Sequence, residues 1–267
     1  MSVELAPLTN FDVGAAAAAA IAFSAFRLRS LSAGGAVAAF AVGTATFGGL
    51  GAAGAGVLLA FFVTSVALSR LGKAEKRKRL VDIGKTGPRD ASQVLANGGV
   101  AALCALLAST DARCAIAFAG AFAAATADTW GTEIGTLARG RPHSILSLRP
   151  IATGLSGGVS LQGTLAELAG ALFIALVAEA FGLGAVLPIA AGGVAGALLD
   201  SLLGASLQSL RWCPQCRRPC ETEPHLCGAN TTPLRGLSFV GNDAVNLACT
   251  LAGAAVAFWL AGPAAPR

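Results

Sequence analysis

The chain has 267 residues, of which 55% are hydrophobic and only 12% charged, with a formal net charge of +5. A soluble domain carries roughly a quarter of charged residues, so this chain has too little polar surface for a soluble fold. The composition predicts an all-α, polytopic membrane protein. The first apolar run follows the acidic residues Glu4 and Asp12 and no basic segment, so we expect no cleavable signal peptide.

Hydrophobic runs divide the chain into eight segments near the length of roughly 20 residues that a bilayer span needs. These segments are 11–27, 33–51, 53–70, 92–109, 113–130, 163–181, 184–206 and 241–261. The second and third are joined by "GGLGAAGAG", which favours a tight turn, and the many Gly and Ala residues favour close helix packing in lipid. We expect one transmembrane domain over residues 1–267 with about eight helices. A Cys-rich loop over 208–237 separates the last two.

Basic residues are distributed very unevenly between the two sides of this predicted bundle. With the N-terminus outside, 17 of the 19 Lys and Arg residues fall on the cytoplasmic side, and only Arg113 and Arg267 lie outside. Cytoplasmic loops of membrane proteins carry such an excess, so both termini are predicted to be outside. The net positive charge is therefore explained by the membrane topology. No aromatic-rich basic pattern accompanies it, which argues against nucleic-acid binding.

Polar residues gather at the predicted cytoplasmic helix ends in five clusters. The clusters are Gln93 and Asn97; Asp128 and Glu133; Gly157, Gly158, Ser160 and Glu167; Asp200, Gly204 and Gln208; and Asn242, Asp243 and Asn246. Residues four apart share a helix face, and charged groups near the hydrocarbon usually face a bundle interior or a watery cavity. We expect one polar site facing the cytoplasm. The alternative is that each residue only caps a helix end among the headgroups.

The residue types in these clusters indicate a chemistry. Carboxylates with amide neighbours suit a hard divalent cation, and Mg²⁺ held by carboxylates and phosphates is usual for phosphoryl transfer. The segment "TGLSGGVSLQGT" (153–164) opens a helix, so its backbone N–H groups could hold phosphate, although no Lys follows as in a Walker A motif. The alternative is a flexible loop. Positive charge for phosphates could come from five residues whose presence topology explains equally well: Lys85, Arg89, Arg139, Arg141 and Arg149.

The segment "CPQCRRPCETEPHLCG" (213–228) lies in the predicted cytoplasmic loop, where disulfides are disfavoured. Closely spaced Cys and His residues with Pro and Gly neighbours suit a structural Zn²⁺. The expected ligands are Cys213, Cys216 and Cys227, with His225 or Cys220 as the fourth. The alternative is a reduced loop without metal. The remaining residues Cys104, Cys114 and Cys249 lie in predicted spans and are interpreted as small apolar packing residues.

Five motifs, in order along nearly the whole chain, resemble the transmembrane protein 19 family, also called domain of unknown function 92. They are "RDASQVLANGG" (89–99), "ADTWGTEIG" (127–135), "GGVSLQGTLAELAG" (157–170), "DSLLGASLQ" (200–208) and "GNDAVNL" (241–247). The Cys loop resembles an insertion of prokaryotic members, although Arg217 stands where Gly is usual and Leu226 precedes Cys227.

The resemblance implies a function, because a characterised plant member of the family is a phytyl-phosphate kinase. The family is also distantly similar to CTP-dependent polyprenol kinases and phosphatidate cytidylyltransferases, whose acidic motifs hold Mg²⁺ and CTP. On this basis a nucleoside triphosphate, CTP in the first instance, would phosphorylate a prenyl monophosphate such as phytyl or geranylgeranyl phosphate. The implied Mg²⁺ ligands are Asp128, Glu133, Asp200 and Asp243. The implied substrate- or phosphate-binding residues are Gln93, Asn97, Gly157, Gly158, Ser160, Gln208, Asn242 and Asn246.

Other functional classes remain open from sequence. A cytidylyltransferase-like lipid enzyme would share these residues but release pyrophosphate. An ion-coupled transporter would place carboxylates near the bilayer midplane in inverted repeats, whereas here the acids cluster on one side. A non-catalytic membrane scaffold would use the Cys loop to bind a partner.

Overall fold

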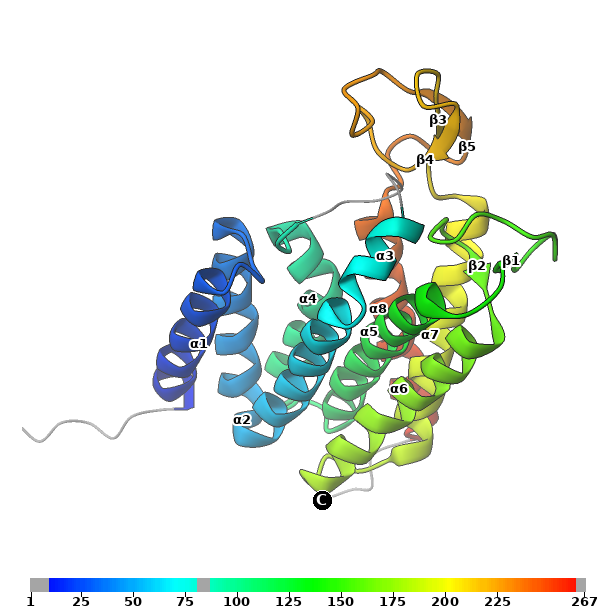
Figure 1. Cartoon of the computed structure of the whole chain (residues 1–267). Coiled ribbons are helices and arrows are strands. Elements are labelled where there is room, and N and C mark those ends of the chain that lie inside the picture. The colour runs from blue at the N-terminus through cyan, green and yellow to red at the C-terminus, as the bar shows by residue number, and fades with distance from the viewer. Residues whose placement is uncertain (1–9, 81–86, 263–267) are drawn as a thin grey trace, which may run out of the picture.

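The computed structural model describes residues 10–80 and 87–262, which form a helical bundle with two small sheets at one end (Figure 1). The helices are α1 (Asn10–Arg27), α2 (Ala33–Arg70), α3 (Lys73–Arg79), α4 (Ala91–Leu107), α5 (Arg113–Leu137), α6 (Leu161–Ala180), α7 (Val186–Ser206) and α8 (Asn242–Leu260). The strands are β1 (His143–Ser144), β2 (Gly158–Val159), β3 (Leu210–Cys213), β4 (Arg218–Cys220) and β5 (Thr232–Arg235). We call the end of the bundle that carries α3 and these strands the sheet end. Glu4, Lys85 and Arg267 lie outside the described residues.

Helix α2 consists of two antiparallel halves joined at Gly51. Its 38 residues would extend about 57 Å as one straight helix, nearly twice the ~30 Å hydrocarbon thickness. Gly51 has φ 57° and ψ −144°, a conformation that glycine adopts without a steric penalty. The side chain of Arg70, at the end of α2, donates a 2.9 Å hydrogen bond to Ser30, just before its start. Both ends of α2 therefore lie at the sheet end, as the predicted segments 33–51 and 53–70 require.

Helix α5 is the central helix of the bundle and contacts α2, α4, α6, α7 and α8. Residues 117–127 are all buried, and most are Ala or Gly, which lets the surrounding helices approach closely. Phe118 and Phe122 fill the space that these small residues leave, with ring centroids 5.2 Å apart. The helix was predicted to end at 130 but continues to Leu137, so its polar C-terminal part stays helical and reaches the sheet end.

Side-chain caps begin three helices at the sheet end. Asp90 and Gln93 form a capping box at α4, in which each side chain accepts a hydrogen bond from the other residue's backbone N–H. Ser160 caps α6 by accepting from the N–H of Gly163, and Ser32 caps α2 in the same way. The caps fix where these helices start, and thereby how their first-turn residues face the interior.

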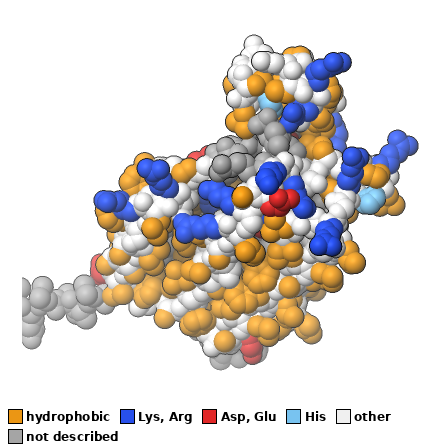
Figure 2. Space-filling model, viewed as in Figure 1, with side chains coloured by type: hydrophobic (Ala, Val, Ile, Leu, Met, Phe, Trp, Pro, Cys, Tyr) orange, Lys and Arg blue, Asp and Glu red, His pale blue; other side chains and the backbone are white. Residues whose placement is uncertain are grey.

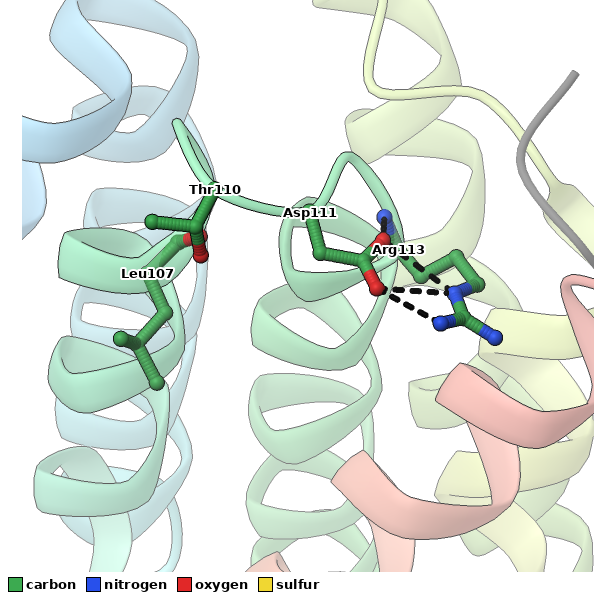
Figure 3. Close-up of polar contacts among 4 residues, drawn as sticks. All are labelled: Leu107, Thr110, Asp111 and Arg113. Atoms are coloured by element: carbon green, nitrogen blue, oxygen red, sulfur yellow. Dashed lines mark hydrogen bonds and ion pairs between the residues drawn. The ribbon is translucent and has the colours of Figure 1, made fainter. Parts of the chain in front are cut away.

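At the opposite end, a tight turn connects α4 to α5 (Figure 3). Asp111 accepts hydrogen bonds from the Arg113 side chain at 2.7–3.2 Å, and the hydroxyl of Thr110 donates to the carbonyl of Leu107. The Arg113 guanidinium also lies 4.2 Å from the ring centroid of Phe258 in α8. Arg113, one of the two basic residues predicted to lie on the outer side, is thus paired locally.

Apolar side chains dominate the flanks of the bundle, and Lys and Arg gather toward the sheet end (Figure 2). By length and composition, four of the described helices could cross a membrane: α2, α6, α7 and α8. Helix α4 is apolar but shorter. The chain is thus a predominantly helical membrane protein, as its composition predicts.

The Cys-rich segment folds around a three-stranded antiparallel sheet in the order β4-β3-β5. These strands were not predicted, because Cys, Pro and Arg in short runs give no clear alternation. Strands β1 and β2 pair as a second small sheet between α5 and α6. Both sheets lie over the polar ends of the helices (Figure 1).

Candidate functional site

A cavity of about 950 Å³ opens among the helix ends at the sheet end. It lies near the upper end of the ~300–1,000 Å³ range of small-molecule sites. Eleven of the twelve residues predicted for the site line it: Gln93, Asn97, Asp128, Glu133, Gly157, Gly158, Ser160, Asp200, Asn242, Asp243 and Asn246. The cavity therefore brings together segments that are far apart in sequence: α4, α5, the loop before α6, α7 and α8.

Gln208 is the predicted site residue that does not line the cavity. We expected it on the face of Asp200 and Gly204 by helical spacing, but α7 ends at Ser206, so the spacing no longer applies. Its buried side chain instead donates hydrogen bonds to Ser156 at 2.8 Å and to Glu221 at 2.9 Å. Gln208 thus supports the wall of the cavity from behind.

The cavity is strongly acidic. Besides the four predicted acids, Glu167, Glu221 and Glu223 line it, whereas Arg89 is the one basic residue among the described lining residues. Burial lowers the pKa of the Arg89 guanidinium, and the charge of Glu133 opposes that shift. An anionic phosphate would be repelled by so many carboxylates unless cations neutralise them.

Three carboxylates from α5, α6 and α7, those of Asp128, Glu167 and Asp200, interact electrostatically across the cavity. Glu167 lies against α5 because Gly131 leaves room for it: a Cβ at Gly131 would lie 2.5 Å from Cγ of Glu167. The buried Oδ2 of Asp200 has no hydrogen-bond partner among the described residues. Such an oxygen is available to a ligand.

Glu133 differs from the other acids because it is already paired. Its carboxylate lies 2.5 Å from Nζ of Lys76 in α3, and the same ammonium donates to the carbonyl of Leu68. Both side chains are largely buried, with exposed fractions of 22% for Glu133 and 7% for Lys76. Glu133 therefore fixes α3 over the cavity, and its charge is partly neutralised before any cation binds.

These acids fit a magnesium ion that is bound through few protein ligands. Among the described residues, no three carboxylates form a group whose ligand oxygens all lie within 4.8 Å of one another. Mg²⁺ is commonly held by one or two carboxylates together with waters and substrate phosphates, rather than by an all-protein cage. The unpartnered oxygen of Asp200, with Asp128 and Glu167 nearby, supplies the oxygen chemistry that this mode requires.

The glycine-rich loop before α6 packs tightly on the end of α7. Gly157 has φ +80°, and a Cβ there would lie 2.4 Å from the backbone nitrogen of Ala205. On its other side, Glu221 accepts hydrogen bonds from the N–H of Ser156 at 2.8 Å and from its hydroxyl at 2.9 Å. Burial raises the pKa of the Glu221 carboxyl, and the hydrogen bonds from Ser156 oppose that shift. The Cys-rich segment thus anchors the loop through Glu221.

Some predicted site residues also have a structural role. Gln93 belongs to the capping box of α4, Ser160 caps α6, and the Asn97 amide donates to the carbonyl of Gln93 at 2.9 Å. Asp243 accepts a 2.6 Å hydrogen bond from Ser92, which ties α8 to α4 at the rim. Gln93 and Ser160 therefore cap helices and also line the cavity.

Of the basic residues considered for phosphate contacts, Lys85 lies outside the described residues and Arg89 lines the cavity. Arg139, Arg141 and Arg149 are exposed on the connection between α5 and the glycine-rich loop and are not among the lining residues, which agrees with the alternative that they set the topology. Glu221, in contrast, was missed as a site residue. Its position beside Cys220 in a presumed metal loop gave no sign that the loop folds back onto the cavity.

Four residues of the Cys-rich segment form a compact cluster that could hold a metal ion: Cys213, Cys216, His225 and Cys227. Their ligand atoms all lie within 4.8 Å of one another. Cys220 lies outside this cluster, with its sulfur 3.9 Å from the carbonyl of Thr222, so the geometry favours His225 over Cys220 as the fourth ligand. Three thiolates and an imidazole are a usual donor set for structural Zn²⁺.

Comparison with known proteins also indicates an integral membrane protein. The chain is 30% identical over 225 residues to Protein PGR of Arabidopsis thaliana, covering 73% of this chain and 77% of that protein. It is 38% identical over 152 residues to an uncharacterized membrane protein of Methanocaldococcus jannaschii, covering 56% of this chain and 63% of the relative. An uncharacterized membrane protein of Synechocystis is 29% identical over 164 residues, covering 58% of this chain and 63% of the relative.

No solved structure matches the chain. The family described as Integral membrane protein DUF92 matches residues 16–254, which is most of the sequence. Together with the relatives above, this match means that the chain belongs to the DUF92 family of integral membrane proteins.

Proposed function

We propose that the protein is a membrane kinase that transfers the terminal phosphoryl group of a nucleoside triphosphate, CTP in the first instance, to a prenyl monophosphate. The observation that carries the proposal is the acidic cavity of about 950 Å³, which combines carboxylates, a glycine-rich loop and a half-buried arginine at one end of an apolar bundle. It is large enough for a nucleotide and lies where a membrane-dissolved lipid phosphate would present its headgroup.

In the proposed reaction, an oxygen of the prenyl phosphate attacks the γ-phosphorus of the nucleotide. The bond from that phosphorus to the β-bridging oxygen breaks, and the nucleoside diphosphate leaves with the electron pair. Because the attacking phosphate is already anionic at neutral pH, no side chain needs to act as a strong base. Catalysis rests on positioning the two phosphates and neutralising their charge.

Each part of the cavity has a proposed role. Asp128 and Asp200, supported by Glu167 and Asp243, would hold Mg²⁺, which when bound neutralises the phosphates. Glu133 would keep α3 in place through Lys76 and act on the ion only at longer range. The amides of Asn97, Asn242 and Asn246 line the cavity and can donate to phosphate oxygens. Backbone N–H groups of the glycine-rich loop would face the nucleotide phosphates.

We also propose the membrane topology. Eight segments would cross the bilayer: α1, the two halves of α2, α4, α5, α6, α7 and α8. They form one transmembrane domain, with the Cys-rich sheet inserted between α7 and α8. The sheet end would face the cytoplasm, because Lys and Arg gather there (Figure 2). Cys213, Cys216, His225 and Cys227 would bind a structural Zn²⁺ that holds this sheet, and Glu221 with it, against the glycine-rich loop.

The test is a transfer assay on purified protein in detergent with Mg²⁺ and geranylgeranyl or phytyl monophosphate. Label from γ-labelled CTP or ATP appearing in a prenyl diphosphate would support the kinase. Label from α-labelled CTP entering the lipid, with release of pyrophosphate, would instead indicate a cytidylyltransferase. Because an acidic cavity also attracts cations, failure of every transfer combined with cation uptake into proteoliposomes would favour a transporter.

A further inference from the structure

A second cavity, apolar and of about 110 Å³, lies between α1, α2 and α4. We call it the α1–α2–α4 groove. Small residues of α1 and α2, such as Ala17, Ala22 and Gly43, create it, and larger side chains such as Leu58 and Phe47 line the remaining walls. It is lined almost wholly by carbon, apart from its polar end.

The groove adjoins the acidic cavity. Four residues line both: Phe61, Arg89, Gln93 and Asn97. Among the described residues, no carboxylate lies within ion-pair distance of the Arg89 guanidinium, although Glu133 acts on it at longer range. A positive group therefore lies at the junction between an apolar groove and a polar chamber.

The groove is elongated along α1. On α1 its lining runs from Ala25, next to the sheet end, to Gly14 near the bend of α2. Eleven helical steps correspond to about 16 Å, or roughly half of the ~30 Å hydrocarbon thickness. The enclosed volume of about 110 Å³ is smaller than a twenty-carbon chain, so a chain lying along the groove would keep one side in contact with lipid, past exposed residues such as Ala17.

We propose that the α1–α2–α4 groove binds the isoprenoid chain of the lipid phosphate, with its phosphate beside Arg89. The proposal rests on the proposed kinase function and adds to it where the lipid chain lies. It also assigns Arg89 as the residue that binds the acceptor phosphate.

The groove should contribute selectivity and positioning rather than affinity. A chain dissolved in the bilayer is already in an apolar solvent, so moving it into an apolar groove yields little hydrophobic free energy. The benefit is geometric, because a held chain fixes the phosphate in line with the nucleotide, and correct placement contributes strongly to phosphoryl transfer. Filling the groove should therefore lower kcat/KM for substrates long enough to reach the obstruction.

The first test compares Ala17→Phe with Ala16→Phe. Ala17 and its neighbour Ala16 are both exposed, but only Ala17 lines the groove, about 12 Å along α1 from Ala25. We expect Ala17→Phe to lower kcat/KM for twenty-carbon geranylgeranyl phosphate at least fivefold. Five-carbon dimethylallyl phosphate, which is too short to reach residue 17, should change less than twofold. Ala16→Phe should change neither substrate.

The second test does not depend on turnover. Geranylgeranyl phosphate with a diazirine at the far end of its chain is irradiated with the wild-type protein, and the labelled peptides are identified by mass spectrometry. Label on α1 and the first half of α2 that unlabelled geranylgeranyl phosphate displaces supports the groove. Label that only bulk phospholipid displaces, or that lies elsewhere, overturns it.

The outcomes separate this inference from the proposed function. If the wild type phosphorylates no prenyl phosphate, the kinase proposal fails, and cross-linking alone decides whether the groove binds the chain. If the wild type is active and Ala17→Phe behaves like Ala16→Phe with both substrates, the groove proposal is refuted and the kinase proposal stands.

Discussion

Replacing Gly157 by alanine should disable the site without unfolding the bundle. Gly157 has φ +80°, and its hypothetical Cβ would lie 2.4 Å from the nitrogen and 2.5 Å from Cα of Ala205. A left-handed conformation costs a non-glycine residue roughly 1–2 kcal/mol. Overlap with backbone atoms that cannot rotate away costs about 1–3 kcal/mol more. The change therefore opposes the native loop conformation by about 2–5 kcal/mol.

The lower of these values already corresponds to about a 30-fold fall in the population of the native loop, since 1.4 kcal/mol is tenfold. We expect at least a tenfold loss of transfer activity in Gly157→Ala. The melting temperature in detergent should change little, because the buried core around α5 lies away from this loop.

Gly140→Ala is the matched control, because Gly140 has φ +97° but is not among the cavity-lining residues, and nothing lies within 4 Å of its hypothetical Cβ. The substitution carries the same conformational cost without the overlap, so transfer activity should stay within about threefold of the wild type. If Gly157→Ala were as active as Gly140→Ala, the close packing of the glycine-rich loop on α7 would have no role in the reaction.

Three further predictions concern α3, the Cys cluster and the topology. Lys76→Met leaves Glu133 without its partner. The free energy of unfolding should therefore fall by an amount between the ~1 kcal/mol of an exposed pair and the ~3–5 kcal/mol of a buried one. Adding Glu133→Gln should restore the melting temperature, and no recovery would contradict the pairing. Cys216→Ser should abolish the one zinc per chain that elemental analysis is expected to find, whereas Cys220→Ser should keep it; equal zinc in both variants would refute the assigned ligand set. In a background that lacks Cys104, Cys114 and Cys249 but keeps the Cys cluster, a cysteine at Thr110 should react with a membrane-impermeant maleimide in intact cells. Protection there with labelling only in inverted vesicles would reverse the proposed topology.

Hydropathy predicted the positions of the helices well, although only four of the described helices are long and apolar enough by themselves to cross a membrane. Predicted segments such as 163–181 and 184–206 lie within a few residues of α6 and α7. The C-terminal part of α5 was predicted less well, because "TWGTEIGTL" contains few apolar residues. This part continues the helix and forms a wall of the cavity. The short helix α3 and the two sheets were missed. Their residues pack against helix ends that sequence alone does not bring together.

Site residues on helices were also predicted better than site residues on loops. Charge asymmetry and helical spacing brought Asp128, Asp200 and Asn246 to one side, and the structure gathers them at one cavity. Contacts that depend on how loops fold back were not predictable. Glu221 reaches Ser156 across 65 residues of sequence, and Gln208 missed the cavity because its helix had already ended. Site residues on helix faces can thus be predicted from sequence, whereas site residues on loops can be identified only from the fold.

The most direct test of the central claim compares Asp128→Asn with Asp111→Asn in the transfer assay. Asp128 lies in the cavity, while Asp111 lies on the α4–α5 turn at the opposite end. With CTP, Mg²⁺ and geranylgeranyl phosphate, we expect Asp128→Asn to lose at least 100-fold in transfer rate while remaining folded and monodisperse in detergent. Asp111→Asn should retain most of the activity. Transfer by Asp128→Asn within a few-fold of the wild type would contradict the assignment of the acidic cavity as the site of phosphoryl transfer.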